Sequence, residues 1–437
     1  MTDRWLYPWG LGSVAFGGAS LLVPLYAVQL GASAFQLGLL ASAAAVAGAP
    51  GAIVFGRLAD HVSFRRPLVI GTLATVAACL AVIPFVSAVT VVIAANAVLW
   101  LVIAAVAPVV TMIVVDAAPE STWAERIGRL NTFQGYGWAG GLLIGAVWPL
   151  AVGRFVGAGT ATRTLFWAFA ACGVFSAAGT AWALPKPDEH VTNPRRLRRI
   201  SRILATSSRS IRGTTVVFSP NRIYWSTRAL RPGQLRGRAN PALVTYLVAV
   251  CLFLSGSAAF WAPLPLALTD AGIGSGTVFA LYLLASLGSA ALYGPAGRLA
   301  SRYDLRRLQA GALAVRGISL PVVALAAGIG AVSLRFGFVG LWLLIVGATW
   351  GVMAVVGTAI VTRLAPPGIR GEVLGIHAAL GAAAGGVGGI LGGWVATIGY
   401  LAAFALAGAL VLLGAALVIS LRIVSGHSLS EESPSRP

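Results

Sequence analysis

Two side chains that can carry a positive charge lie inside long apolar segments of the sequence. Arg316 is about nine residues into its segment, roughly 13 Å deep if a helix rises about 1.5 Å per residue. An isolated arginine at that depth costs several kcal/mol unless it is paired or its head group reaches the surface. We expect a structural or snorkelling role for Arg316, with binding of an anionic substrate as the alternative. His377 lies early in another segment, and an unperturbed histidine side chain is the one that changes charge in the physiological pH range. It is a candidate proton site, although a packed, hydrogen-bonding histidine is the commoner arrangement.

The other residues with chemical potential form no catalytic or metal-binding group. The histidines are scattered, and the cysteines lie within apolar segments without CxxC spacing, so we interpret the cysteines as core-filling residues. No apolar segment carries a carboxylate near its middle. An enzyme or a metal centre needs several such side chains at one depth, so we expect no enzymatic activity, no cofactor and no metal. The residues concerned are His61, His190, His377, His427, Cys79, Cys172 and Cys251.

The composition is that of a membrane protein. Of 437 residues, 58% are hydrophobic and 10% are charged, and the mean hydropathy is +0.87. The 31 Lys and Arg residues outnumber the 12 Asp and Glu residues. On a soluble domain this excess would suggest a nucleic-acid partner. Here the basic residues lie between apolar segments, so we interpret them as topogenic and expect no nucleic acid.

Twelve segments are long enough to cross a bilayer, which takes about 20 apolar residues in a helix. The first is too long for a signal peptide and is expected to stay as a membrane helix. The fold class expected is therefore an all-α membrane protein with twelve transmembrane helices. The expected spans are residues 9–30, 35–58, 67–86, 89–116, 128–152, 164–184, 242–268, 276–299, 308–329, 334–362, 373–398 and 400–423.

The basic residues are distributed unequally between the two sides of the membrane. Twelve spans place both termini on one side, and 27 of the basic residues fall on that side. The opposite side holds Arg154, Arg163 and Arg335. Because cytoplasmic loops are enriched in Lys and Arg, both termini are predicted to be cytoplasmic, in a prokaryotic plasma membrane.

Four regions follow from this arrangement. Residues 1–184 and 242–423 are each expected to form a six-helix bundle, residues 185–241 a basic cytoplasmic linker, and residues 424–437 a cytoplasmic tail. Within the linker, leucines and isoleucines recur at helical spacing among arginines between residues 195 and 211. This pattern is typical of an amphipathic helix on an anionic leaflet, and a disordered basic linker is the alternative.

A short polar stretch after the second span returns in the second half. Residues 56–66 read GRLADHVSFRR and residues 297–307 read GRLASRYDLRR, identical at six of eleven positions at an offset of 241. Residues 116–126 lead into the fifth span much as residues 363–370 lead into the eleventh. One unit therefore appears twice. Paired hinges among twelve spans resemble the major facilitator superfamily, in its twelve-span form, over nearly the whole chain, and among its members the multidrug and solute efflux branch.

The resemblance implies that the hinge is a latch on the cytoplasmic side. Gly56 would let the second helix approach the eleventh, whose N-terminal end Asp60 would face. A hinge arginine would pair with Asp116, and Ser301 in place of the acid would weaken the second copy. The alternative is that these charges only fix topology. The predicted latch comprises Gly56, Arg57, Asp60, Arg65, Arg66, Asp116, Gly297, Arg298 and Arg306.

The resemblance also places the first, fourth, seventh and tenth helices around a central cavity, flanked by the second, fifth, eighth and eleventh. Asn131, Gln134 and Trp138 share one face of the fifth helix, and the two amides are the first choice because an amide in a membrane needs a partner. Helix packing or interfacial anchoring is the alternative for each candidate. The predicted substrate-binding residues are Tyr26, Asn96, Trp100, Asn131, Gln134, Trp138, Phe253, Ser257, Trp261, Tyr282, Trp342, Thr349 and Trp350.

The sequence therefore predicts a secondary transporter that moves a small organic solute by rocking of two halves, with export of an amphipathic or apolar compound. One alternative is a nutrient or metabolite carrier, for an organic anion if Arg316 faces the cavity. Another is a sensor or scaffold that shares the fold and does not transport. The resemblance implies proton coupling, although the buried acid common in proton-coupled members is absent. We expect a monomer that contacts its solute and an anionic cytoplasmic leaflet.

Overall fold

The computed structural model describes residues 3–58, 65–116, 123–184, 241–329, 332–365 and 370–421. Within these ranges the regular secondary structure is helical, which confirms the predicted fold class. A helix satisfies its own backbone hydrogen bonds and is therefore stable in lipid. The predicted linker, the C-terminal tail and Asp60 of the hinge lie outside the described residues.

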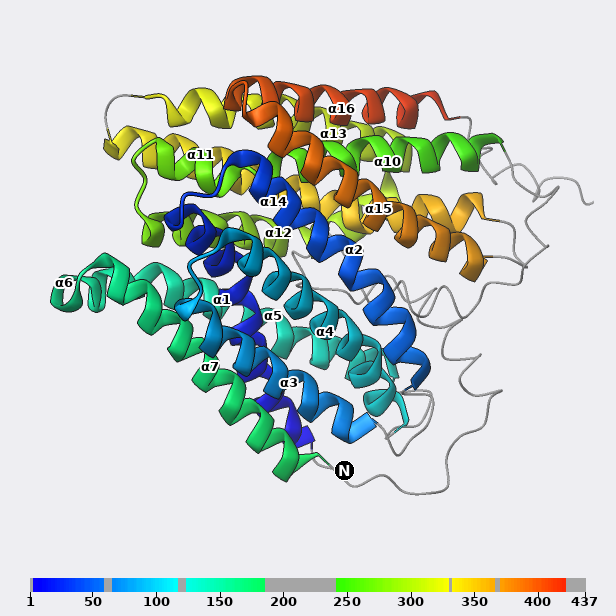
Figure 1. The fold of residues 1–437 in the computed structure, drawn as a ribbon. Coiled ribbons are helices and arrows are strands. Elements are labelled where there is room, and N and C mark those ends of the chain that lie inside the picture. The colour runs from blue at the N-terminus through cyan, green and yellow to red at the C-terminus, as the bar shows by residue number, and fades with distance from the viewer. Residues whose placement is uncertain are drawn as a thin grey trace, which may run out of the picture.

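The helices form two bundles, one from each half of the chain (Figure 1). The first half contains η1 (Asp3–Trp5), α1 (Leu6–Gln29), α2 (Ala34–Leu58), α3 (Arg65–Val82), η3 (Ile83–Phe85), α4 (Val89–Asp116), α5 (Trp123–Ala151), α6 (Gly153–Val156) and α7 (Ala158–Ala183). The second half contains α10 (Pro241–Trp261), α11 (Leu264–Asp270), α12 (Ser275–Arg302), α13 (Leu305–Ala327), α14 (Val332–Leu364), α15 (Arg370–Ala396) and α16 (Tyr400–Ser420).

The spans agree with the hydropathy of the sequence, with two exceptions. Eleven of the described helical segments are long and apolar enough to cross a membrane. The twelfth span is α5, whose first turns carry Glu125, Arg126 and Arg129. The seventh span was expected to be one helix, but a turn at Ala262 and Pro263 divides it into α10 and α11. A proline has no backbone N–H to continue the helical ladder, so it begins α11 rather than extending α10.

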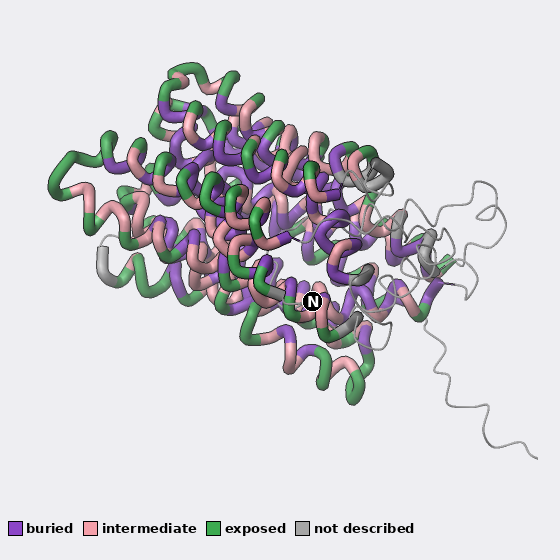
Figure 2. Tube along the Cα trace, turned by 90° about the horizontal axis from the view of Figure 1, so that it is seen from below, coloured by how far each residue is buried: buried purple, intermediate pink, exposed green. Residues whose placement is uncertain are grey.

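The two bundles repeat the same packing. In the first, α1 packs against α5 and α7, α2 against α4, and α3 against α4 and α7. In the second, α10 packs against α15 and α16, α12 against α14, and α13 against α14 and α16. Buried residues gather between the helices, and the outer surface is exposed (Figure 2). Large apolar side chains such as Phe155, Trp182 and Ile398 lie on that surface, as a lipid-facing surface requires.

Glycines make the contact between α2 and α15, which joins the two bundles. A Cβ atom on Gly38 would lie 2.4 Å from the carbonyl oxygen of Gly389, so a larger residue does not fit there. One turn further, the Ser42 hydroxyl donates a hydrogen bond of 2.6 Å to the carbonyl oxygen of Gly386. The close approach of these helices was predicted at Gly56. The close approach that the structure describes is at Gly38, about five turns away at 3.6 residues per turn; the surroundings of Gly56 lie outside the described residues, so its role stays a prediction.

The symmetry-related contact between α5 and α12 lies on the same side of the protein. Gly145 of α5 accommodates the ring of Phe279, because a Cβ atom there would be 2.3 Å from that ring. Toward the side of the N-terminus the bundles diverge (Figure 1). On that side, a Cβ atom on Gly297 of the second hinge would meet no atom within 4 Å. The protein is therefore closed on one side and open on the side of the N-terminus.

Candidate functional site

A cavity of about 250 Å³ lies between the two bundles. Its wall is formed by α1, α2, α4 and α5 from the first half and by α10 to α15 from the second. Most of the wall is apolar. The polar and aromatic residues that line it are Ser20, Asn96, Trp100, Trp138, Trp261, Tyr282, Ser286, Ser289, Arg316 and Trp350.

The first half contributes two tryptophans and an amide to this wall. Trp100 lies one turn after Asn96 on α4, so both side chains point to the same face of the helix. The Trp100 ring lies 6.5 Å from the Trp138 ring of α5, with an angle of 53° between the planes. The Asn96 amide donates a hydrogen bond of 3.3 Å to the carbonyl oxygen of Leu40, which fixes its orientation against α2.

The second half contributes a matching aromatic wall. Trp261 ends α10 and meets Tyr282 of α12 edge to face, with ring centroids 5.1 Å apart. The Tyr282 hydroxyl has no hydrogen-bond partner in the part of the chain that the structure describes. It is therefore a donor and acceptor that the cavity offers to a solute. Trp350 of α14 completes this wall.

Arg316 of α13 also lines the cavity, although the ninth helix belongs to neither the central nor the flanking set that the resemblance implies. The side chain is 1% exposed, so it does not snorkel to the membrane surface. Its Nε donates to the Ser257 hydroxyl at 3.1 Å, and its Nη1 donates to the Val346 carbonyl at 2.7 Å and the Thr349 hydroxyl at 3.4 Å. Its Cζ atom lies 5.8 Å from the centre of the Trp350 ring. These contacts tie α13 to α10 and α14.

Ser257 and Thr349 were both predicted to bind substrate. Their hydroxyl oxygens instead accept hydrogen bonds from Arg316, and neither residue lines the cavity. Tyr26 is also placed elsewhere. Its hydroxyl is within hydrogen-bonding distance of the carbonyl oxygens of Pro84 and Val86, at 3.2 and 2.9 Å, and it joins α1 to the segment between α3 and α4.

Four further candidates lie away from the cavity wall. On α5 the wall begins at Trp138, so Asn131 and Gln134 lie one to two turns nearer the open side. Phe253 is buried against Gly414 of α16. Trp342 packs on the hydrophobic core of its own bundle.

His377 of α15 is likewise outside the cavity wall. Its ring is stacked on that of Tyr246 with 6.4 Å between centroids. The Tyr246 hydroxyl is buried and bonds to the Gln309 side-chain oxygen at 3.0 Å and to the Gly357 carbonyl oxygen at 3.3 Å. The packed role is thus the one that the geometry fits, and a proton site at His377 stays a prediction.

Small residues of α2 form a part of the cavity wall, although none of them was predicted to bind substrate. Ala41, Ala44, Ala45, Gly48 and Ala49 all line the cavity. Small side chains let a neighbouring surface come close to a helix, so they leave room for a solute. In the sequence, the run of alanines and glycines from residue 41 to 52 is the pattern from which this face could have been predicted.

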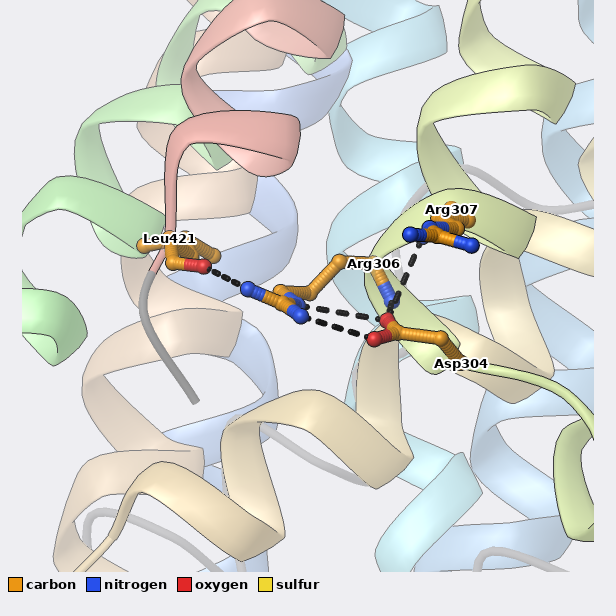
Figure 3. A network of polar contacts seen from close by, with 4 residues as sticks. All are labelled: Asp304, Arg306, Arg307 and Leu421. Atoms are coloured by element: carbon orange, nitrogen blue, oxygen red, sulfur yellow. Dashed lines mark hydrogen bonds and ion pairs between the residues drawn. The ribbon is translucent and has the colours of Figure 1, made fainter. Parts of the chain in front are cut away.

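The described part of the hinges makes contacts within each half. Arg66 donates a hydrogen bond to the carbonyl oxygen of Ala181, at the end of α7. In the second half, Arg306 donates to the carbonyl oxygen of Leu421, just after α16 (Figure 3). Arg65 is buried and Arg298 is exposed. The side chains of the other predicted latch residues in the first half lie outside the description, so the pairing with Asp116 stays a prediction.

Asp304 organises the second hinge (Figure 3). It is the N-cap of α13 and accepts hydrogen bonds from the backbone N–H groups of Arg306 and Arg307 at 2.8 and 3.4 Å. Its carboxylate also pairs with the Arg306 guanidinium at 2.8 Å. Mainly through the hydrogen bond from that guanidinium, the pKa of Asp304 is lowered to about 2.

Two six-helix bundles that repeat one packing scheme around a shared cavity define a secondary membrane transporter rather than an enzyme. The family model described as Major Facilitator Superfamily matches residues 10–331 and 246–437. The chain therefore belongs to that superfamily and is a multi-pass membrane protein. The efflux branch within the superfamily stays a prediction.

Solved structures show the same fold. Two crystal structures of the nucleoside transporter NupG, one of them a mutant, match with a TM-score of 0.72. Their sequences are 11% and 12% identical to this one, over 96% of this chain and 98% of theirs. No curated protein sequence matches the chain.

Proposed function

We propose that the protein carries a small amphipathic organic solute across the membrane by alternating access through the central cavity. The observation that carries the proposal is the position of the cavity between the bundles, with walls from both halves. Rocking of the halves about their contact would open the same cavity to either side.

The wall supports a solute with a flat, largely apolar body. Trp100 and Trp138 on one side and Trp261, Tyr282 and Trp350 on the other offer rings for stacking and edge contacts. The polar groups between them are few, as expected for a site that uses them for orientation. A nucleoside, the ligand class in the name of the two similar structures, has a flat base and belongs in the test panel.

We place the open side in the cytoplasm, because the side of the N-terminus is also that of the arginine-rich loops. Importers and exporters both pass through such a conformation, so it does not set the direction; we propose export because the wall is mostly aromatic and apolar, which suits an amphipathic compound. In vesicles of inverted orientation, export appears as accumulation of labelled solute inside. Accumulation only in right-side-out vesicles would instead support uptake of a nutrient or metabolite.

A reversible cross-link tests alternating access directly. A Cβ atom on Gly386 would lie 3.9 Å from the Cβ of Ala45, the separation found in disulfides. In a protein whose native Cys79, Cys172 and Cys251 are replaced by Ser, oxidation of the Ala45→Cys/Gly386→Cys pair is expected to stop transport, and a reductant to restore it. Each single cysteine variant is the matched control. Unchanged flux through the fully cross-linked protein would exclude movement at this contact and contradict alternating access there, whereas no flux in either the oxidised or the reduced protein would support the scaffold alternative.

A further inference from the structure

The Arg316 guanidinium has an unused donor face. Of its five N–H groups, those on Nε and Nη1 have acceptors in Ser257, Val346 and Thr349. The two N–H groups of Nη2 have no acceptor in the described part of the chain. Because Arg316 lines the cavity, these two donors are available to a solute there.

The charge of Arg316 is not balanced by the protein around it. Its hydrogen-bond acceptors are two hydroxyls and a carbonyl, and the cavity-lining residues that the structure describes include no Asp or Glu. Burying a cation without a counter-ion costs several kcal/mol, even where neutral groups satisfy part of its hydrogen bonding. An anion in the cavity would remove that cost and would be stabilised in return.

A purely structural role explains only part of this arrangement. Hydrogen bonds to α10 and α14 need Nε and Nη1, and neutral side chains make such interhelical bonds at lower cost in a membrane. The positive charge and the free Nη2 remain unexplained by packing. The Tyr282 hydroxyl, on the same half of the wall, also has no partner among the described residues and offers a second donor.

We propose that Arg316 is the anchor for an amphipathic organic monoanion, a carboxylate whose apolar body lies between the tryptophans of the two halves. This inference rests on the proposed transport function and specifies its substrate class. Among the described residues of the cavity wall, Arg316 is the one that carries a charge, so a single negative charge is neutralised. A dianionic phosphate would leave one charge uncompensated in an apolar cavity.

Three ligands that share one ring system isolate the charge: indole-3-acetate, indole-3-acetamide and tryptamine. Binding is measured by calorimetry on the purified full-length protein, and flux by counterflow in proteoliposomes. We expect indole-3-acetate to bind at least tenfold more tightly than the amide and the amine. In Arg316→Gln this preference should disappear. Arg163→Gln removes an exposed arginine of α7 without a described contact and should keep the preference.

Arg316→Lys keeps the positive charge and gives a second test, which does not depend on correct folding of the glutamine variant. Its ammonium lacks the planar fork, so affinity for indole-3-acetate should fall severalfold while the preference over the amide persists. Equal binding of all three ligands by the native protein, no binding of any of them, or a preference that survives Arg316→Gln would overturn the inference.

The flux measurement separates the inference from the function on which it rests. If the amide and the acetate move equally well, transport stands and the anion anchor does not. If the acetate binds through Arg316 but no ligand moves, the anchor stands and the proposed function does not.

Discussion

Arg66 and Arg306 make the same contact in the two halves of the protein. Each guanidinium donates a hydrogen bond to a main-chain carbonyl oxygen 115 residues further along the chain, that of Ala181 or of Leu421. The two arginines are thus 240 residues apart, whereas the hinge sequences match at an offset of 241. The contact that is conserved between the halves therefore shifts by one residue relative to the sequence repeat. In both halves it ties the third helix of a bundle to the end of the sixth.

Loss of the Asp304 carboxylate should destabilise the second hinge. Asp304→Ala removes the N-cap of α13 and the ion pair, and is expected to cost about 1 kcal/mol. Asp304→Asn keeps the capping oxygen, and because the ion pair is partly exposed it should cost less than half of that. Thermal unfolding in detergent measures both. Equal melting temperatures for the native protein and the alanine variant would contradict the capping role.

The same ion pair predicts a pH dependence. The pKa of Asp304 is about 2 in the folded protein and about 3.9 in an unfolded chain. A folded-state pKa that is lowered stabilises the protein above the unfolded value, and the contribution is lost as the pH falls through the folded one. The stability difference between native protein and Asp304→Asn should therefore be full above about pH 5 and shrink toward pH 2. A difference that grows on acidification would contradict this assignment.

Removal of the Tyr26 hydroxyl should affect stability and not binding. Tyr26→Phe leaves the carbonyl groups of Pro84 and Val86 without this donor, at a cost of about 1 kcal/mol. The affinity for whichever indole ligand binds should stay within twofold of the native value. A large loss of affinity with normal stability would return Tyr26 to the substrate site.

Trp138 and Gln134 should differ in their effect on binding. Trp138 lines the cavity and Gln134 does not. Trp138→Ala should weaken binding of the indole ligands about tenfold, equivalent to about 1.4 kcal/mol. Gln134→Ala should leave affinity unchanged in the same calorimetric measurement. A larger loss of affinity in Gln134→Ala than in Trp138→Ala would mean that the solute binds between the cavity and the open side.

A methyl group at Gly38 should loosen the closed side. Because its Cβ would meet the Gly389 carbonyl at 2.4 Å, Gly38→Ala is expected to cost about 1–3 kcal/mol as an overpacked contact. Faster modification of a cysteine at Ser42 by a membrane-impermeant maleimide, in a protein without its native cysteines, would report the opening. Gly48→Ala is the control on the same helix, since its Cβ would lie 3.6 Å from Ala104. Equal labelling rates in both variants would contradict the prediction.

The spans could be predicted from the sequence because hydropathy depends only on composition along the chain. The predicted segment 89–116 matches the bounds of α4, and the ends of the other helices differ by a few residues. The break after Trp261 was missed because an apolar run on both sides of Pro263 looks continuous in hydropathy.

The cavity wall was harder to predict because it depends on how each helix is rotated and tilted in the bundle. Trp100, Trp138 and Trp350, which were predicted to bind substrate, line the cavity, whereas the predicted residues Ser257 and Thr349 accept hydrogen bonds from Arg316; substrate binding by any of them stays a prediction. Arg316 itself comes from a helix that a family-level scheme places at the periphery. A side chain as long as arginine reaches past its own helix, and no periodicity in the sequence reports how far.

The contact between α2 and α15 has one further consequence, which concerns entropy. Gly38 and Gly389 have no side chain, so closing this contact freezes no rotamers, and opening it releases none. The described hydrogen bond from Ser42 to Gly386 is a small enthalpic term that water replaces when the helices part. The closed and open forms are therefore expected to differ little in free energy at this contact. A bound solute that contacts both halves would then decide which form the protein populates.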